Sequence, residues 1–415
     1  MAFASYIKNQ FLQIRIFNTN ARKLITANVL FGMFNPFYLI FTSTFIYNAS
    51  KGNLEFNLLY SGFSYIGISL GFVSNGYFVR LLKIRTLMVL GVLLMFLSIM
   101  AMFLLPKSFF TETWMLVFGF ATGIGVGIYW AARNYLTVVN TNDTNRDFYA
   151  GIDFIFISFG RILTPLIVGI YIGEGVKRQW FSQGFAYQST LIFAFLLVFL
   201  IAWIILPRKF RNVEPKPFLF WQYSKKWFHA RLMTLVWGYF SGMFIAIPPI
   251  LILKFIGNES VVGILSSLAY LAAMIVVYYL SSRSKSKHRT SILKVGVGLQ
   301  IIGTLAFAIL LPMNSSLATI ILILSMFLAD PIIGFPFRAS FMKAIDEAKP
   351  LDKRDHYAYI VDVEIACGIG RILALVSFYL LYISLPENWA YIIFMALVVI
   401  LQMAFIPLSK RINGR

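Results

Sequence analysis

Long apolar stretches alternate with short polar segments along almost the whole chain. A helix needs roughly 20 mostly apolar residues to cross about 30 Å of hydrocarbon, and twelve stretches reach that length. The pattern therefore predicts an all-α polytopic membrane protein with twelve transmembrane helices. They lie at about 24–47, 56–79, 86–106, 112–135, 148–172, 186–206, 230–254, 259–281, 291–312, 316–342, 357–383 and 388–408.

The polar segments between the apolar stretches differ in charge. Those on the side of the N-terminus, together with the two termini, hold 29 of the 36 lysine and arginine residues. Basic residues collect on the cytoplasmic side of membrane proteins, so we expect a multi-pass protein of the cytoplasmic membrane with both termini in the cytoplasm. The net charge of +20 is then explained by the basic residues on the cytoplasmic side of the membrane, and no nucleic-acid partner is predicted.

Composition narrows the class further. The chain is 59% hydrophobic and 13% charged, whereas soluble domains are about 25% charged. Its single cysteine excludes an internal disulfide framework. The three histidines all fall at predicted helix borders, and no phosphate-binding glycine loop is present. We therefore predict that the protein is not an enzyme and binds no metal or cofactor. The cysteine and histidines that could have served as ligands or catalytic groups are Cys367, His229, His288 and His356.

A basic, proline-containing segment falls between the sixth and seventh predicted spans and is the longest polar stretch of the chain. It is typical of a linker between two sets of six helices. The predicted segments are a cytoplasmic N-terminal segment at 1–23, an N-terminal six-helix bundle at 24–207, the cytoplasmic linker at 208–228, a C-terminal six-helix bundle at 229–408 and a cytoplasmic tail at 409–415.

Internal repetition supports this division. Residues 146–150 read R-D-F-Y-A, and residues 354–358 read R-D-H-Y-A. Each is followed by an aspartate and then by G-R-I-L, at 160–163 and 370–373. Parallel six-helix repeats around a site near the bilayer midplane are a known transporter plan.

With twelve spans in two repeated halves, a basic central linker and cytoplasmic termini, the chain resembles the major facilitator superfamily. Gly76 matches the loop motif between spans two and three, although Arg80 stands where the family has aspartate. Gly160, Pro165 and Gly169 match a fifth-span pattern found in antiporters. The resemblance implies two pseudo-symmetric six-helix bundles and a monomeric symporter or antiporter that works by alternating access.

Two arginines lie near the middle of predicted spans at equivalent repeat positions, Arg161 in the fifth and Arg371 in the eleventh. A charge at mid-bilayer is costly and is a functional candidate by default. Two guanidinium groups facing each other could hold a carboxylate or phosphate bidentately. The alternative is that each arginine pairs with a buried carboxylate and braces the two halves.

Three carboxylates are candidates for proton coupling: Asp330, Glu364 and Asp153. A carboxylate in a low-dielectric cavity can load and release a proton near neutral pH. Glu364 lies seven residues before Arg371, which puts both close to one helix face. A permanent ion pair with an arginine is the alternative for each carboxylate.

Uncharged candidates for substrate contact lie on the first, fourth and seventh spans, which line the cavity in the family. They are Asn35, Tyr129, Trp130 and Tyr239. Aromatic side chains in a bilayer also serve as packing or interfacial groups, so both readings stay open.

These observations predict a secondary active transporter that moves a small organic anion through the lipid bilayer, with the proton as coupling ion. The alternative is an exporter or flippase of an amphiphilic compound or lipid. An amphiphile pathway needs an apolar lateral opening, whereas a small-anion carrier needs a closed, basic cavity.

The topology leads to a direct prediction. A cysteine introduced near Lys51 or Lys177 should react with a membrane-impermeant thiol reagent added outside intact cells. A cysteine near Lys216 or Lys285 should react only after lysis, because the positive-inside rule places those segments in the cytoplasm. The reverse labelling pattern would disprove the orientation.

Overall fold

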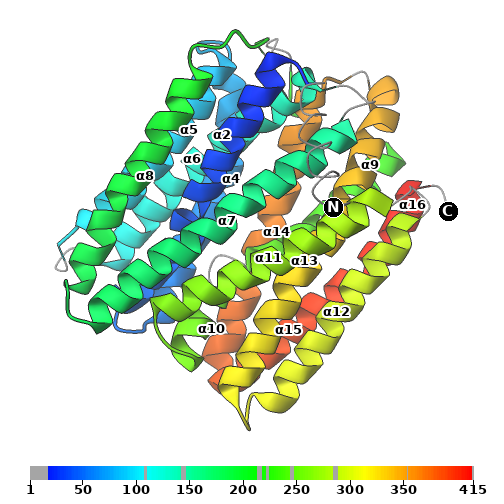
Figure 1. The fold of residues 1–415 in the computed structure, drawn as a ribbon. Helices are drawn as coiled ribbons and strands as arrows, with labels where there is room; N and C mark the ends of the chain where they lie inside the picture. Colours follow the sequence, from blue (N-terminus) through cyan, green and yellow to red (C-terminus); the bar gives the residue numbers. More distant parts are fainter. Residues whose placement is uncertain are drawn as a thin grey trace, which may run out of the picture.

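The computed structural model shows a bundle of long helices (Figure 1). Parts of the predicted N-terminal segment and linker, at 1–16, 213–216 and 221–223, lie outside the described residues. The described residues are 17–106, 110–141, 146–212, 217–220, 224–243, 247–283, 288–352 and 354–413.

The N-terminal half begins with a helix that changes its hydrogen-bonding pattern midway. α2 (Thr19–Pro36) continues through a π-helical turn, η2 (Phe37–Phe41), into α3 (Thr42–Ala49). The following helices are α4 (Leu54–Phe78), α5 (Ile84–Leu104), α6 (Glu112–Asn140), α7 (Arg146–Lys177) and α8 (Gln183–Ile205).

The C-terminal half also opens with a divided helix, α9 (Lys225–Gly242) and α10 (Ile247–Phe255). Its last span is divided as well, into α15 (Glu387–Met403) and α16 (Phe405–Asn413). The helices between them are α11 (Glu259–Arg283), α12 (Arg289–Leu310), α13 (Ser315–Asp352) and α14 (His356–Ser384).

Within the described residues, twelve helical segments are long and apolar enough to cross a membrane, which confirms the twelve predicted spans. A helix satisfies its backbone polar groups internally, as hydrocarbon requires. The tenth span is longer than predicted. The sequence predicts its end at residue 342, but α13 continues to Asp352, and Lys343 and Glu347 form an i,i+4 ion pair of 3.8 Å on this extension. Pro331 and Pro336 lie inside this continuous helix.

Short polar side chains mark where helices begin. Asn18 accepts a hydrogen bond from the backbone N–H of Ala21 at 2.7 Å, and Ser182 caps α8 in the same way. Asn53 and Ser224 cap α4 and α9. These caps satisfy N–H groups that a helix start leaves without a partner.

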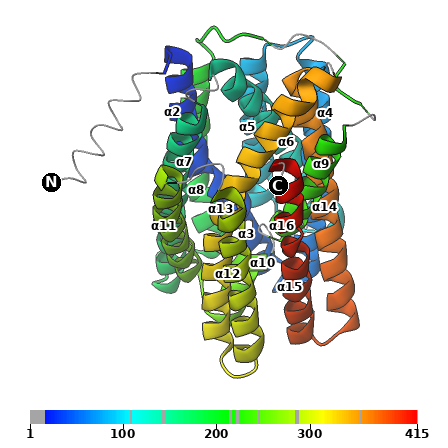
Figure 2. The same ribbon diagram turned by 90° about the vertical axis from the view of Figure 1, so that its right-hand side faces the viewer.

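The helices form two bundles that meet along two long contacts (Figures 1 and 2). α4, α5 and α6 pack together in the first bundle, where α2 packs against α7 and α8. In the second bundle α12 packs on α13, and α9 on α14. α7 of the first bundle lies along α11 of the second, and α4 lies along α14.

Small residues allow the closest of these helix crossings. A Cβ added at Gly123 of α6 would collide with the backbone of Ser64 in α4. A Cβ at Gly263 of α11 would likewise meet the backbone of Pro165 in α7. Close approach of this kind drives helix association in a membrane, so glycine sets both the internal packing of the first bundle and the contact between bundles.

The linker lies across one end of the molecule (Figure 1). There Asn20 donates a hydrogen bond to the carbonyl of Lys209 at 2.9 Å, and the backbone N–H of Ile84 donates to Asn212 at 2.8 Å. We call this end the linker face. The opposite end, the far face, carries the connections at 50–53, 178–182, 256–258, 311–314 and 385–386.

Candidate functional site

Charged side chains from both bundles gather where α6, α7 and α13 come together. Arg338 lies within electrostatic range of four of them, and we call the five residues together the central charge cluster. The cluster contains one more cation than anions. Its members are Arg133, Asp153, Arg161, Asp330 and Arg338.

Arg161 holds no ion pair in the described part of the chain. Its guanidinium lies 5.8 Å from the ring centroid of Tyr270, a residue of α11. Its Nε is buried and has no hydrogen-bond partner. A buried N–H without an acceptor costs about 1–3 kcal/mol, and among the described residues no carboxylate forms an ion pair that offsets that cost at Arg161.

Asp330 and Arg338 lie on α13, two helical turns apart, and interact with Arg161 across the boundary between bundles. Arg338 is exposed although Phe337 beside it is only 7% exposed. Its guanidinium therefore reaches accessible space from an otherwise buried stretch of helix. Neither Asp330 nor Arg338 has an ion pair within 4.0 Å in the described segments.

Asp153 is held differently. Its side chain is 5% exposed, forms an ion pair with Arg133 and accepts a hydrogen bond from Asn28 Nδ2 at 2.6 Å. The Arg133 guanidinium lies 4.7 Å from the ring centroid of Trp130. Of the three predicted proton carriers, Asp153 is the one tied to both a cation and an amide within its own bundle.

The equivalent aspartate of the second repeat has the same kind of environment. Asp362 accepts a hydrogen bond from Trp227 Nε1 at 2.7 Å and pairs with Arg231 at 3.1 Å. The sequence could not identify these partners, because they lie on another helix, α9. The repeated aspartate was the only signal available for this second polar anchor.

The other predicted arginine lies in a second polar group. Arg371 forms an ion pair with Glu364 on the same helix, and their side chains are 17% and 12% exposed. The guanidinium lies 5.6 Å from the ring centroid of Tyr65 on α4. Tyr65 in turn donates a hydrogen bond to the carbonyl of Gly242, at the end of α9, at 2.5 Å. Both arginines thus lie over a tyrosine ring, but only Arg371 forms an ion pair among the described residues.

The π-helical turn of the first span brings Tyr38 toward this second group. Its hydroxyl lies 3.1 Å from Ser64 Oγ, within electrostatic range of Arg371 and Glu364. Single π-turns inside α-helices occur often at functional sites. After Asn35 and Pro36 the helix thus changes its hydrogen-bonding pattern without being interrupted.

The uncharged candidates occupy varied positions. Tyr129 is fully buried and stacks on Phe31 with ring centroids 3.8 Å apart. Tyr239 shares a hydrogen bond with Ser377 of its own bundle at 2.6 Å. Asn35 is 4% exposed, and its side-chain oxygen has no partner. Of these three, Asn35 has hydrogen-bonding capacity to spare.

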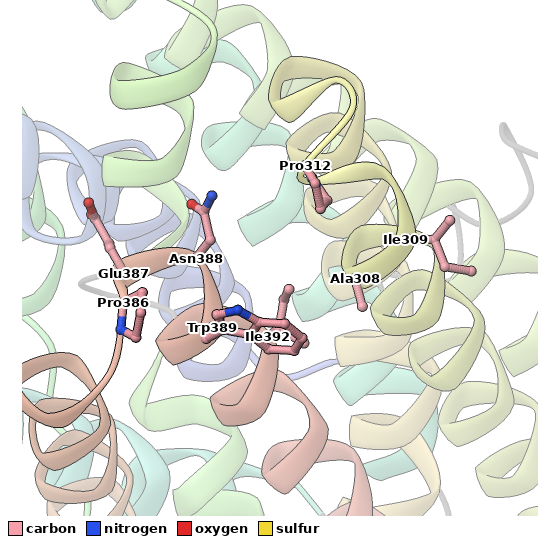
Figure 3. Close-up of a pocket in the computed structure, with 8 residues that line it drawn as sticks. All are labelled: Ala308, Ile309, Pro312, Pro386, Glu387, Asn388, Trp389 and Ile392. Atoms are coloured by element: carbon pink, nitrogen blue, oxygen red, sulfur yellow. The ribbon is translucent and has the colours of Figure 1, made fainter.

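A hollow of about 770 Å³ lies elsewhere, between α12 and α15 at the far face (Figure 3). Its walls are mainly apolar, and its one carboxylate, Glu387, is paired with Lys254. It therefore lacks the cationic groups of the central charge cluster. The lining residues are Ala308, Ile309, Pro312, Pro386, Glu387, Asn388, Trp389 and Ile392.

Comparisons with known proteins agree with this architecture. The family model described as Major Facilitator Superfamily matches residues 22–358. The chain is also 25% identical over 278 residues to "Uncharacterized protein YqgE" of Bacillus subtilis (strain 168). That match spans 66% of this chain and 63% of the relative.

The contrast between the two buried aspartates is testable. Asp153→Asn leaves the Arg133 guanidinium buried without its counter-charge, and breaking a buried pair costs about 3–5 kcal/mol. Asp330→Asn breaks no ion pair and should change stability far less. Thermal unfolding of purified protein measures both. Glu174→Gln, at an exposed i,i+4 pair with Arg178, is the control and should cost under about 0.5 kcal/mol. Equal losses for the two aspartate variants would contradict this assignment.

Proposed function

Because the chain belongs to the Major Facilitator Superfamily, a family of membrane transporters, we propose that it carries a small organic anion across the cytoplasmic membrane by alternating access. The positive excess of the central charge cluster is the observation that carries this proposal. Arg161 is only partly exposed within its span, where a cation without a counter-charge is costly. A bound anion would supply the missing negative charge.

Arg161 is the residue best prepared to bind it, since it forms no ion pair among the described residues, whereas Arg133 is paired with Asp153. Arg338 reaches accessible space from the opposite bundle and lies within electrostatic range of Arg161. An anion held between them would contact both bundles at once. Its binding would therefore favour arrangements in which the bundles approach each other, as a carrier requires.

In this proposal, protonation of a neighbouring carboxylate controls whether Arg371 can bind the substrate. Its guanidinium is occupied by Glu364. A proton on Glu364 would remove that negative charge and leave Arg371 free to accept a carboxylate from the substrate. Proton and anion would then bind together, as in a symporter. Asp330, which forms no ion pair among the described residues, is the second site at which a proton could enter the cluster.

The orientation follows from charge. The linker face carries the basic segments identified in the sequence, so we assign it to the cytoplasm. The exposed position of Arg338 on α13 supports access to the cluster from that side.

The arginine assignment predicts a loss of affinity without unfolding. Lysine keeps the charge but lacks the planar fork that binds a carboxylate bidentately. Arg161→Lys and Arg371→Lys should each weaken binding of an anion found in a thermal-shift screen of carboxylates and phosphates. A charge-assisted hydrogen bond contributes about 1.5–3 kcal/mol, so we expect roughly tenfold to hundredfold weaker binding by calorimetry.

Arg178→Lys, in an exposed ion pair near the far face, is the matched control and should bind as the parent does. Lower thermal stability of the ligand-free Arg161 and Arg371 variants, with unchanged affinity, would instead assign both arginines to bracing. A screen that yields amphiphiles and no anions would favour the exporter or flippase alternative.

Proton coupling is tested at Asp330. Asparagine keeps the side-chain volume and removes the titratable group, so Asp330→Asn should abolish gradient-driven accumulation in proteoliposomes while preserving exchange of substrate. Asp346→Asn, an exposed carboxylate on the same helix, should leave both activities intact. Undiminished accumulation by the Asp330 variant would remove this residue from the coupling mechanism.

A further inference from the structure

A buried carboxylate at the far face joins the two bundles. Glu259 is the first residue of α11 and is 5% exposed. Its Oε1 accepts hydrogen bonds from Asn48 Nδ2 at 2.7 Å, Gln183 Nε2 at 2.8 Å and the Tyr187 hydroxyl at 3.2 Å. All three donors belong to the first bundle: Asn48 lies on α3, and Gln183 and Tyr187 lie on α8. One carboxylate of the second bundle thus depends on three groups of the first.

The donors that contact the Glu259 carboxylate are all neutral groups. Among the described residues, no lysine or arginine forms an ion pair with this carboxylate. Neutral donors alone must compensate for its removal from water, and hydrogen bonds to an ionised acceptor are about twice as strong as neutral ones. Separation of the bundles would break the three bonds together and return the carboxylate to water.

An apolar layer lies next to this polar contact. Ile40 of η2 packs in a buried cluster whose other members come from the second bundle, including Ile252 of α10 and Val262 of α11. This cluster is separate from the main core, and its members are at most 7% exposed. Val262 lies one helical turn from Glu259, so the apolar layer and the polar contact are continuous.

We propose that Glu259 is the latch of a seal that closes the far face to the extracellular solution, with the Ile40 cluster as its apolar plug. This assignment rests on the proposed alternating access and on the cytoplasmic position of the linker face. Opening outward requires that the latch break, so weakening it should shift the population toward outward-open molecules.

Because Cys367 is the only cysteine of the chain, its replacement leaves a background in which one introduced cysteine can report the accessibility of the seal. In a Cys367→Ala background, Ile40→Cys places a reporter inside the plug. A membrane-impermeant thiol reagent added outside intact cells should label it slowly, because the plug is closed. Adding Glu259→Ala removes three charge-assisted bonds and should speed labelling by at least roughly tenfold.

Two milder variants should speed labelling less than Glu259→Ala does. Glu259→Gln keeps a carbonyl acceptor without the charge, so its labelling should be intermediate. Tyr187→Phe removes one donor from the other bundle with little change in shape, and should speed labelling by a few-fold. Thermal unfolding confirms that each protein is folded before labelling.

Glu387→Ala is the matched control. Glu387 lies at the same face, but its ion pair with Lys254 joins α15 to α10 within one bundle. Its removal should leave the labelling rate of Ile40→Cys unchanged. Unchanged labelling in both Glu259→Ala and Tyr187→Phe, or equal acceleration in Glu387→Ala, would overturn the latch.

Labelling needs no substrate, so its outcome is independent of which anion, if any, is carried. If the orientation is inverted, the Glu259 variants should accelerate labelling only when the reagent reaches the cytoplasmic side. That result would correct the proposed topology and keep the latch, whereas no acceleration from either side would reject the latch itself.

Discussion

Hydrocarbon offers no water to a polar group, and this constraint organises the whole molecule. Backbone groups are satisfied within helices, and most charges in the spans have a nearby partner. Asp153 pairs with Arg133, Asp362 with Arg231 and Glu364 with Arg371. Against this background, the unpaired Arg161 and the exposed Arg338 stand out as exceptions. Exceptions to pairing are where a membrane protein is expected to do chemistry or bind ligands.

The same constraint explains how two bundles can move without coming apart. At the crossing of α7 and α11, Gly263 approaches the backbone of Pro165 too closely for any side chain. Such a contact gains from van der Waals packing and needs no polar partner, so a small rotation leaves it intact. In the proposed opening of the far face, the contacts that would have to break are the hydrogen bonds of Glu259 and the apolar packing of the Ile40 cluster.

The linker explains the glycine of the family's loop motif that this chain retains. The loop after α4 carries Arg80 where the family has aspartate, yet Gly76 is present. The structure shows a reason for the glycine: a Cβ there would meet the ring of Phe218 in the linker. Phe218 also packs edge-on against Tyr77 of α4 and Tyr357 of α14, with ring centroids 5.2 and 5.9 Å apart. An aromatic contact thus joins the two bundles where the family pattern has a charged loop.

The sequence by itself determined the twelve spans and the all-α class, because helix length and apolar content are properties of contiguous residues. It also exposed the repeat, and with it the equivalence of Arg161 and Arg371. Helical spacing put Glu364 on the face of Arg371, and the structure joins them in an ion pair. The tertiary structure alone shows which polar groups come together across helices: Asp153 forms an ion pair with Arg133, Asp330 lies within electrostatic range of Arg161, and Glu259 accepts hydrogen bonds from three donors. Those pairings join residues 20 to more than 200 positions apart, and no local period encodes how separate helices are placed against one another.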